Sequence, residues 1–138
     1  MKTSYVDVQS DDIDRLGHVN NSIYLRWVEA AVHAHWMGTA CADDRAAFDW
    51  IAVRHEIDYR KPALMGERLA INVALTSVRR ARAWYATTIY RGSELIAEVV
   101  SCWCCIDART GRLTVVPAGT IARFEALTIT GTSGSAAA

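Results

Sequence analysis

The sequence predicts an α+β fold in which one long helix packs against an antiparallel β-sheet. Residues 22–37 carry apolar side chains at helical spacing, and the runs after residue 53 alternate apolar and polar residues with a period of two. The gaps between these later runs are short and rich in turn-forming residues, which favours antiparallel pairing of neighbouring strands. With 138 residues, 51% of them hydrophobic, the chain is long enough for one domain with a sizeable core.

The predicted helix spans residues 22–37 and follows a polar stretch, residues 11–21, that predicts a loop. Asn20 or Asn21 is a suitable N-cap, and Gly38 is a suitable stop. The side chains at helical spacing form a stripe wide enough for a largely buried helix. They are Ile23, Tyr24, Trp27, Val28, Ala31, Val32 and His35.

Strands are expected on both sides of this helix. The mixed segment at residues 5–8 predicts a first strand, and residues 39–50 are loop-like with some helical character. The later strands are predicted at residues 53–60, 69–75, 84–90, 95–106 and 113–116, in a meander with breaks at residues 61–67, 79–82, 91–94 and 107–112.

The end of the chain is expected to add a short helix from Pro117 to about residue 126. We expect a single domain over residues 1–127 and a low-complexity tail over residues 128–138.

Charge and hydropathy exclude several classes of protein. Fifteen Lys and Arg residues balance fifteen Asp and Glu residues, so the formal net charge is zero. Proteins that bind a nucleic-acid backbone usually carry a basic excess, so we expect no nucleic-acid partner. No apolar run approaches the roughly 20 residues of a membrane helix, and the first residues lack the pattern of a secretory signal. We therefore expect a cytoplasmic protein that does not bind membranes.

The four cysteines are expected to be reduced thiols rather than metal ligands. They are Cys41, Cys102, Cys104 and Cys105, and the last three fall in the long apolar run at residues 95–106. A zinc site usually needs two spaced ligand pairs, and the sequence has none. We expect no metal.

The polar stretch before the helix is the best candidate for a catalytic site. Residues 12–21 hold two carboxylates, an imidazole and two amides. The first N–H groups of a helix have no partner inside it, and the helix dipole adds partial positive charge there, so they can stabilise a developing oxyanion. A carboxylate upstream, on a loop turned by Gly17, can act at the same place as base or nucleophile. Helix capping and turn formation are the structural alternative for these residues.

Two motifs resemble those of a known family. Residues 12–29, DIDRLGHVNNSIYLRWVE, resemble the signature of hotdog-fold acyl-CoA thioesterases of the hydroxybenzoyl-CoA thioesterase type. That signature is Asp-x-Asp-x-x-Gly-x-Val, then Asn and Tyr, then Trp or Phe and an acidic residue on the helix. Residues 59–67, YRKPALMGE, resemble the family's Tyr-x-x-Pro-Ala-x-x-Gly-Asp turn. The resemblance covers most of residues 5–125.

This resemblance implies a hotdog fold, in which a curved antiparallel sheet wraps a long central helix. It implies a homodimer or homotetramer with the active site at the dimer interface. The implied reaction is hydrolysis of an acyl-CoA or acyl carrier protein thioester, with no cofactor other than the coenzyme A of the substrate. The family's catalytic carboxylate, a nucleophile or a base for water, falls on Asp14. The backbone N–H that polarises the thioester carbonyl falls on Asn21, at the start of the helix.

Supporting roles follow from the same resemblance. His18 and Asn20 fall where the family's site is lined by His and Asn, beside Gly17, and Tyr24 would face the acyl group or the core. The family also places basic contacts to coenzyme A in a turn between strands, and arginine forks suit phosphate groups. Here that turn contains Arg79, Arg80 and Arg82.

The sequence departs from the family at two places. Arg15 follows the catalytic carboxylate where many members have Pro or Ala, and Asn21 replaces an aromatic residue found in some members. A backbone donor does not depend on its side chain, so the oxyanion role is retained. Acyl specificity does not carry over.

Two other functions share the fold. Hotdog hydratases and dehydratases carry Asp-x-Asn-Pro-x-His, with Asp and His five residues apart. Here Asp14 and His18 are four residues apart and the Asn-Pro pair is missing. The sequence also leaves open a non-catalytic hotdog protein that binds acyl-CoA.

Overall fold

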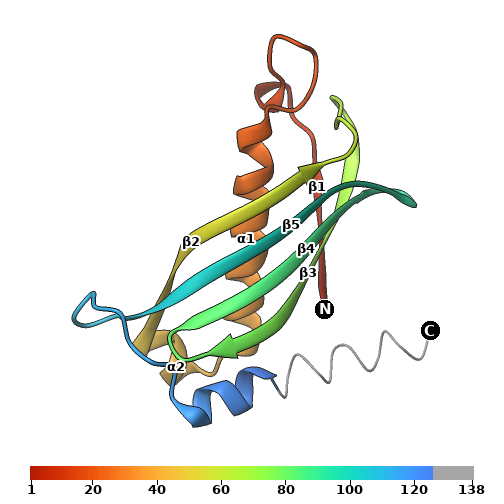
Figure 1. Cartoon of the computed structure of the whole chain (residues 1–138). Helices are drawn as coiled ribbons and strands as arrows, with labels where there is room; N and C mark the ends of the chain where they lie inside the picture. The colour runs from red at the N-terminus through yellow and green to blue at the C-terminus, as the bar shows by residue number, and fades with distance from the viewer. Residues whose placement is uncertain (126–138) are drawn as a thin grey trace.

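A computed structural model describes residues 1–125 (Figure 1). Its elements are β1 (Lys2–Asp7), a 3-10 turn (Ser10–Asp12), α1 (Asn21–Thr39), α2 (Ala42–Ala47), β2 (Phe48–Tyr59), β3 (Arg68–Arg79), β4 (Arg82–Arg91) and β5 (Glu94–Asp107). Residues 118–125 are helical, as expected after Pro117. The predicted tail at residues 128–138 lies outside the described residues.

The five strands form one antiparallel sheet in the order β1-β3-β4-β5-β2, which curves around α1 (Figure 1). This is the α+β arrangement that the sequence predicts, with a long central helix and a curved sheet. The pairing is not a simple meander, because β2 pairs with β5 and not with β3, which follows it in the chain. Residues 60–67, here called the crossover loop, therefore pass the ends of β5 and β4 to reach β3.

The core lies between α1 and the concave face of the sheet. The predicted stripe is confirmed, except that Trp27 is only partly buried. Apolar side chains of the three central strands complete the core. They are Leu69, Ile71 and Val73 of β3, Ala83, Tyr85 and Ile89 of β4, and Ile96, Ala97, Val99 and Trp103 of β5.

The predicted stop at Gly38 is wrong, because α1 continues through it and ends at Thr39. Glycine ends a helix mainly by adopting a left-handed conformation, and Gly38 is not among the residues with positive φ. The last carbonyls find other donors. Arg45 Nη1 donates to Met37 O at 3.3 Å and to Ala40 O at 2.8 Å.

Strand β2 begins five residues earlier than predicted, and a β-bulge interrupts its pairing between Ala52 and Arg54. The bulge moves the buried face by one residue and leaves Val53 52% exposed. The predicted alternation of buried and exposed residues starts at Val53. It therefore does not include residues 48–52, which precede the bulge. The partly buried residues are Phe48, Trp50 and Ala52 before the bulge, and His55 and Ile57 after it.

The predicted strand at residues 113–116 is also wrong, since only one bridge, between Leu113 and Ile106, forms there. The chain then turns into the C-terminal helix, which packs Phe124 at 1% exposure against the core. Arg123 of this helix binds the buried carboxylate of Asp44, through Nε at 3.0 Å and Nη2 at 2.9 Å. The last described helix is thus fixed to α2.

The four cysteines are free thiols, as predicted, and the three in β5 are buried. Burial raises the pKa of the Cys105 thiol to about 12 and also raises the pKa of Cys102. These side chains behave as small core residues.

His35 is a buried histidine in the middle of this core. It is 2% exposed, and its Nδ1 lies 3.0 Å from the Tyr85 hydroxyl oxygen. Burial, followed by the positive charges of the amino terminus and Lys2, lowers its pKa to about 4. His35 is therefore neutral in the folded protein at neutral pH.

This burial predicts a specific loss of stability in acid. An unfolded histidine has a pKa near 6.5, so between about pH 6.5 and 4 the unfolded chain binds a proton that folded His35 does not. The stability that neutral His35 contributes is present above this window and is lost as pH falls through it. Between pH 7 and 4.5 the unfolding free energy should fall by about 2 kcal/mol more in the unchanged protein than in His35→Gln.

Urea titrations at the two pH values measure this difference. His33→Gln is the matched control, because His33 is exposed and two residues away on the same helix. It should keep the full pH dependence. Equal pH dependence in His35→Gln and the unchanged protein contradicts the prediction.

Candidate active site

A pocket of about 420 Å³ lies at the N-terminal end of α1. Three parts of the chain meet there: the loop before α1 with the first helical turn, the end of β2, and the crossover loop. The lining residues are Asp14, Leu16, His18, Val19, Asn20, Asn21, Tyr24, Tyr59, Arg60, Lys61 and Pro62. The structure thus brings five of the predicted site residues together, namely Asp14, His18, Asn20, Asn21 and Tyr24.

The loop before the helix is a tight turn that fixes Asp14. The Asp14 N–H donates to His18 O at 2.8 Å, and the Gly17 N–H donates to Asp14 O at 3.1 Å. Gly17 has φ +79°, which favours glycine and explains why the turn contains it. Asp14 Oδ1 accepts the Leu16 N–H at 2.9 Å, whereas Oδ2 accepts no hydrogen bond from the described residues. One oxygen of a half-buried carboxylate is therefore left for chemistry.

The first turn of α1 leaves one backbone donor unused. Asn20 is the N-cap, and its Oδ1 accepts the Ser22 N–H at 3.0 Å. Asn20 O accepts the Ile23 N–H at 2.9 Å. The N–H of Asn21, which lies between Asn20 and Ser22 in the chain, donates no hydrogen bond to any described residue. Asn21 lines the pocket at a helix start, where the helix dipole gives partial positive charge, so its unpaired N–H is a candidate donor to a ligand there.

Asn20 and Gly17 therefore have clear structural roles. Asn20 lines the pocket, but its carboxamide oxygen is occupied by capping. Gly17 shapes the turn and is not among the lining residues. His18 is exposed and lines the pocket, and its ring makes no hydrogen bond with the described residues.

Two tyrosines form one wall of the pocket. Tyr24 is 2% exposed, and its ring meets that of Tyr59 edge to face, with centroids 5.2 Å apart. Tyr24 Oη accepts the Ala63 N–H at 3.1 Å, and Tyr59 Oη donates to Asn21 O at 3.1 Å. Burial raises the pKa of both hydroxyls, so they stay neutral. Tyr24 thus faces both the core and the pocket.

Sequence reasoning missed Tyr59 and Pro62 as pocket residues. They reach the helix start only because β2 lies at the sheet edge and the crossover loop passes over the pocket. The sequence predicts Tyr59 near the end of a strand and Pro62 in the turn after it. No local spacing signals this contact, because the residues lie about 40 positions away from Asn21 in the chain.

Two cations stand at the rim of the pocket. Arg60 pairs with Glu98, with Nε 3.0 Å from Oε2, and Lys61 Nζ lies 2.7 Å from Glu94 Oε2. Both basic side chains are more than half exposed. Such surface ion pairs are weak, so both cations are available to an anionic ligand.

The three predicted arginines lie elsewhere. Arg79, Arg80 and Arg82 surround a separate hollow of about 520 Å³ with Trp84. The turn between β3 and β4, which contains them, lies at the opposite end of the sheet from the start of α1 (Figure 1). The crossover loop enters β3 at Arg68, so the whole strand, roughly 35 Å long, separates the two places. Within one chain the structure does not bring these arginines to Asp14.

Another pocket, of about 290 Å³, lies along the second half of α1. Its walls include Trp36, Trp50 and Trp103. It contains no helix N-terminus and shares no lining residue with the first pocket. We therefore place the candidate active site in the first pocket.

Neither a metal site nor a membrane span is found in residues 1–125. No three His, Cys, Asp or Glu side chains there are grouped so that they could hold a metal ion. None of the helices in that range has the length and hydropathy needed to cross a membrane.

The family model of the thioesterase-like superfamily matches residues 8–124, a range that contains the entire pocket. The chain belongs to this superfamily. It is a thioester hydrolase, as the sequence motifs predict.

Individual relatives agree with this assignment. The long-chain acyl-CoA thioesterase FadM of Escherichia coli (strain K12) is 26% identical over 115 residues, which are 76% of this chain and 83% of that protein. A thioesterase from Thermus thermophilus, solved with coenzyme A and Zn, has 24% identity and a TM-score of 0.77 over 88% of this chain and 95% of its own. Slr0204, a 1,4-dihydroxy-2-naphthoyl-CoA thioesterase from Synechocystis, has 21% identity and a TM-score of 0.71 over 83% and 88%. The structural likeness confirms the hotdog fold.

Proposed function

We propose that the protein hydrolyses acyl-CoA thioesters in the pocket at the start of α1, with Asp14 and the Asn21 N–H as the catalytic pair. The supporting observation is that a half-buried carboxylate with one free oxygen and an unpaired helix N–H line the same pocket. The names of FadM and Slr0204 specify acyl-CoA substrates, which supports the same substrate class here. Acyl carrier protein thioesters are a second class to assay alongside.

The reaction divides between these two groups. The thioester carbonyl oxygen accepts a hydrogen bond from the Asn21 N–H, and the positive end of the helix stabilises the negative charge that grows on this oxygen. In one route Asp14 takes a proton from water as the water oxygen attacks the carbonyl carbon. The C–S bond then breaks, and the thiolate of coenzyme A leaves with the proton that Asp14 accepted.

The second route uses Asp14 as a nucleophile. Its free carboxylate oxygen attacks the carbonyl carbon and expels the thiolate, which gives an acyl–aspartyl anhydride. Water then cleaves the anhydride to regenerate the carboxylate. Both routes need the same two groups and give the same carboxylic acid and thiol.

The free edge of the sheet supports a homodimer. Among residues 1–125, strand β2 pairs only with β5, and along this edge Ile51 and Val53 are 53% and 52% exposed. An unpaired strand of 12 residues is normally covered, and a second copy can pair with it antiparallel. That pairing would bring the Phe48 end of the partner's β2 to the Tyr59 end of this one. A tetramer would need a further contact.

Such a dimer also gives a role to the turn that contains Arg79, Arg80 and Arg82, here called the arginine turn. Arg79 and Arg82 lie at the same end of the sheet as Phe48, because β4, β5 and β2 are paired there in register. The turn of a second copy would therefore stand at the same end as the Asp14 pocket of the first. We propose that it binds the phosphates of coenzyme A, together with Arg60 and Lys61 at the rim.

Replacing the carboxylate tests the proposed base or nucleophile. Asp14→Asn keeps the Oδ1 acceptor for the Leu16 N–H but can neither take a proton nor attack. We expect kcat for acyl-CoA hydrolysis to fall about 10²–10⁴-fold, measured by release of free thiol. A kcat equal to that of the unchanged protein would remove Asp14 from the mechanism. Hydration of an enoyl-CoA by the unchanged protein would instead favour the hydratase alternative.

Removing the backbone donor tests the oxyanion role directly. Proline is favoured at the first helical position and lacks an N–H, and Asn20, with φ −58° and ψ 136°, has the backbone that precedes proline. Asn21→Pro should therefore fold and lower kcat by about 10²–10³-fold. Asn21→Ala is the control, because it keeps the N–H and should leave kcat near its original value. The oxyanion role is wrong if both variants have the same kcat.

Removing one positive charge tests the phosphate contact. Arg80→Gln should raise KM for acyl-CoA by about 10-fold, flatten its dependence on salt and leave kcat unchanged. Lys2→Gln, in β1 at the opposite edge of the sheet from β2, should change neither constant. Steady-state kinetics at two salt concentrations separates these outcomes, and an unchanged KM in Arg80→Gln excludes this turn from the site.

A further inference from the structure

The crossover loop holds together the two segments that carry the catalytic pair. Its centre is Ala63, which is fully buried. The Ala63 N–H donates to Tyr24 Oη at 3.1 Å, and Ala63 O accepts the Val19 N–H at 2.9 Å. Val19 immediately precedes the helix cap, and Tyr24 follows the first helical turn. One peptide position of the loop therefore fixes both sides of the helix start.

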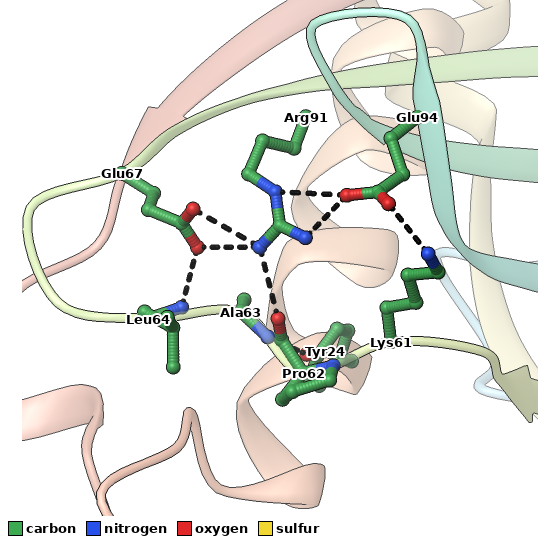
Figure 2. A network of polar contacts seen from close by, with 8 residues as sticks. All are labelled: Tyr24, Lys61, Pro62, Ala63, Leu64, Glu67, Arg91 and Glu94. Carbon is green, nitrogen blue, oxygen red and sulfur yellow. Dashed lines mark hydrogen bonds and ion pairs between the residues drawn. The ribbon is translucent and has the colours of Figure 1, made fainter.

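The loop is itself held by one arginine, Arg91, at the end of β4 (Figure 2). Its Nη1 donates to Pro62 O at 3.0 Å and to the two oxygens of Glu67 at 2.9 and 3.0 Å. Its Nε donates to Glu94 Oε1 at 3.1 Å, and Nη2 also meets Glu94. The guanidinium thus bonds the loop at two places and the start of β5 at a third.

The two glutamates extend this grip to further residues of the loop. Glu67 Oε1 also accepts the Leu64 N–H at 2.6 Å, and Glu94 Oε2 lies 2.7 Å from Lys61 Nζ. Figure 2 shows Arg91 between these two carboxylates, with Pro62 below the guanidinium and Lys61 beside Glu94. The side chains of Arg91 and Glu67 are only 28% and 21% exposed, so this pair is better shielded from solvent than the rim pairs.

None of these three charged residues lines the pocket, whereas two of the loop residues that they hold do. Lys61 and Pro62 are lining residues, and Ala63 binds two more, Val19 and Tyr24. Arg91 is therefore one contact away from the pocket wall. Only an arginine offers five donors in a planar fork, which the carbonyl and two carboxylates here require.

We propose that Arg91 is a positioning residue for thioester hydrolysis, which holds the crossover loop so that the Asn21 N–H and Asp14 face one substrate carbonyl. This rests on the proposed function of Asp14 and Asn21. The contacts of Arg91 with Pro62, Glu67 and Glu94 are here called the clamp. Loss of the clamp lets Ala63 move, and the peptide groups on both sides of the helix start move with it. A displacement near 1 Å at such a site costs on the order of 10²-fold in rate.

Arg91→Met tests the proposal, with Arg123→Met as the matched control. Arg123 also binds a carboxylate, Asp44, but its contacts lie among α2 and the C-terminal helix. The folded fraction of each variant is measured by urea titration, and kinetics are run where both are folded. We expect Arg91→Met to lower kcat about 10- to 100-fold, Arg91→Lys to lower it less, and Arg123→Met to leave it unchanged.

A double-mutant comparison separates positioning from simple destabilisation. If Arg91 acts by aligning the Asn21 N–H, Arg91→Met should cost much less in the Asn21→Pro background, where that donor is absent. Equal fold-losses in both backgrounds, or a kcat for Arg91→Met equal to that of the unchanged protein, overturn the proposal. If Arg91→Met does not fold, Glu94→Gln replaces it, because it weakens one arm of the clamp and should lower kcat several-fold in the same background-dependent way.

The Asp14→Asn variant distinguishes failure of the positioning role of Arg91 from failure of the proposed roles of Asp14 and Asn21. If Asp14→Asn is inactive and Arg91→Met is fully active, only the positioning role fails. If Asp14→Asn is fully active, Asp14 has no catalytic role and the positioning role fails for it, and if the unchanged protein hydrolyses no acyl-CoA, the proposed function itself fails.

Discussion

The rest of the site depends on two hydrogen bonds made by the buried backbone of Ala63. Its N–H and its carbonyl both lie in the interior, and each needs a partner there because an unpaired buried polar group costs on the order of 1–3 kcal/mol. Tyr24 supplies the acceptor and Val19 the donor. This requirement joins three segments that are far apart in the chain: the loop before α1, its first turn and the crossover between β2 and β3. The pocket lies where they meet.

The geometry of the proposed catalytic pair depends more on backbone hydrogen bonds than on the identity of the side chains around it. Asn20 caps the helix by accepting the Ser22 N–H, and the preceding donor, the Asn21 N–H, has no partner in the part of the chain that the structure describes. The side chain of Asn21 makes no hydrogen bond among the described residues, so the position can vary while its N–H remains. Asp14 is held in the same way, by hydrogen bonds of its own turn. The geometry is therefore set by the shape of a short loop and the end of a helix.

Local patterns in the sequence predicted the parts of the molecule that local physics determines. The stripe along residues 22–37 placed α1 to within two residues. The polar stretch before it predicted a carboxylate close to the helix start, and the family resemblance singled out Asp14 and Asn21, which both line one pocket. Pairing of β2 with β5 and the clamp at Arg91 were not predictable, because each joins residues tens of positions apart. The bulge at Val53 was not predictable for a different reason. It shifts an alternation by one residue without changing the composition of the strand.

The cysteines of β5 have a consequence for a protein whose reaction releases a thiol. Thiol–disulfide exchange proceeds through the thiolate and requires access to sulfur. Cys102 and Cys105 are buried, and burial raises the pKa of each, so at neutral pH they are protonated and out of reach. A disulfide formed by oxidation of the released thiol would therefore find no accessible thiolate at these two positions with which to exchange.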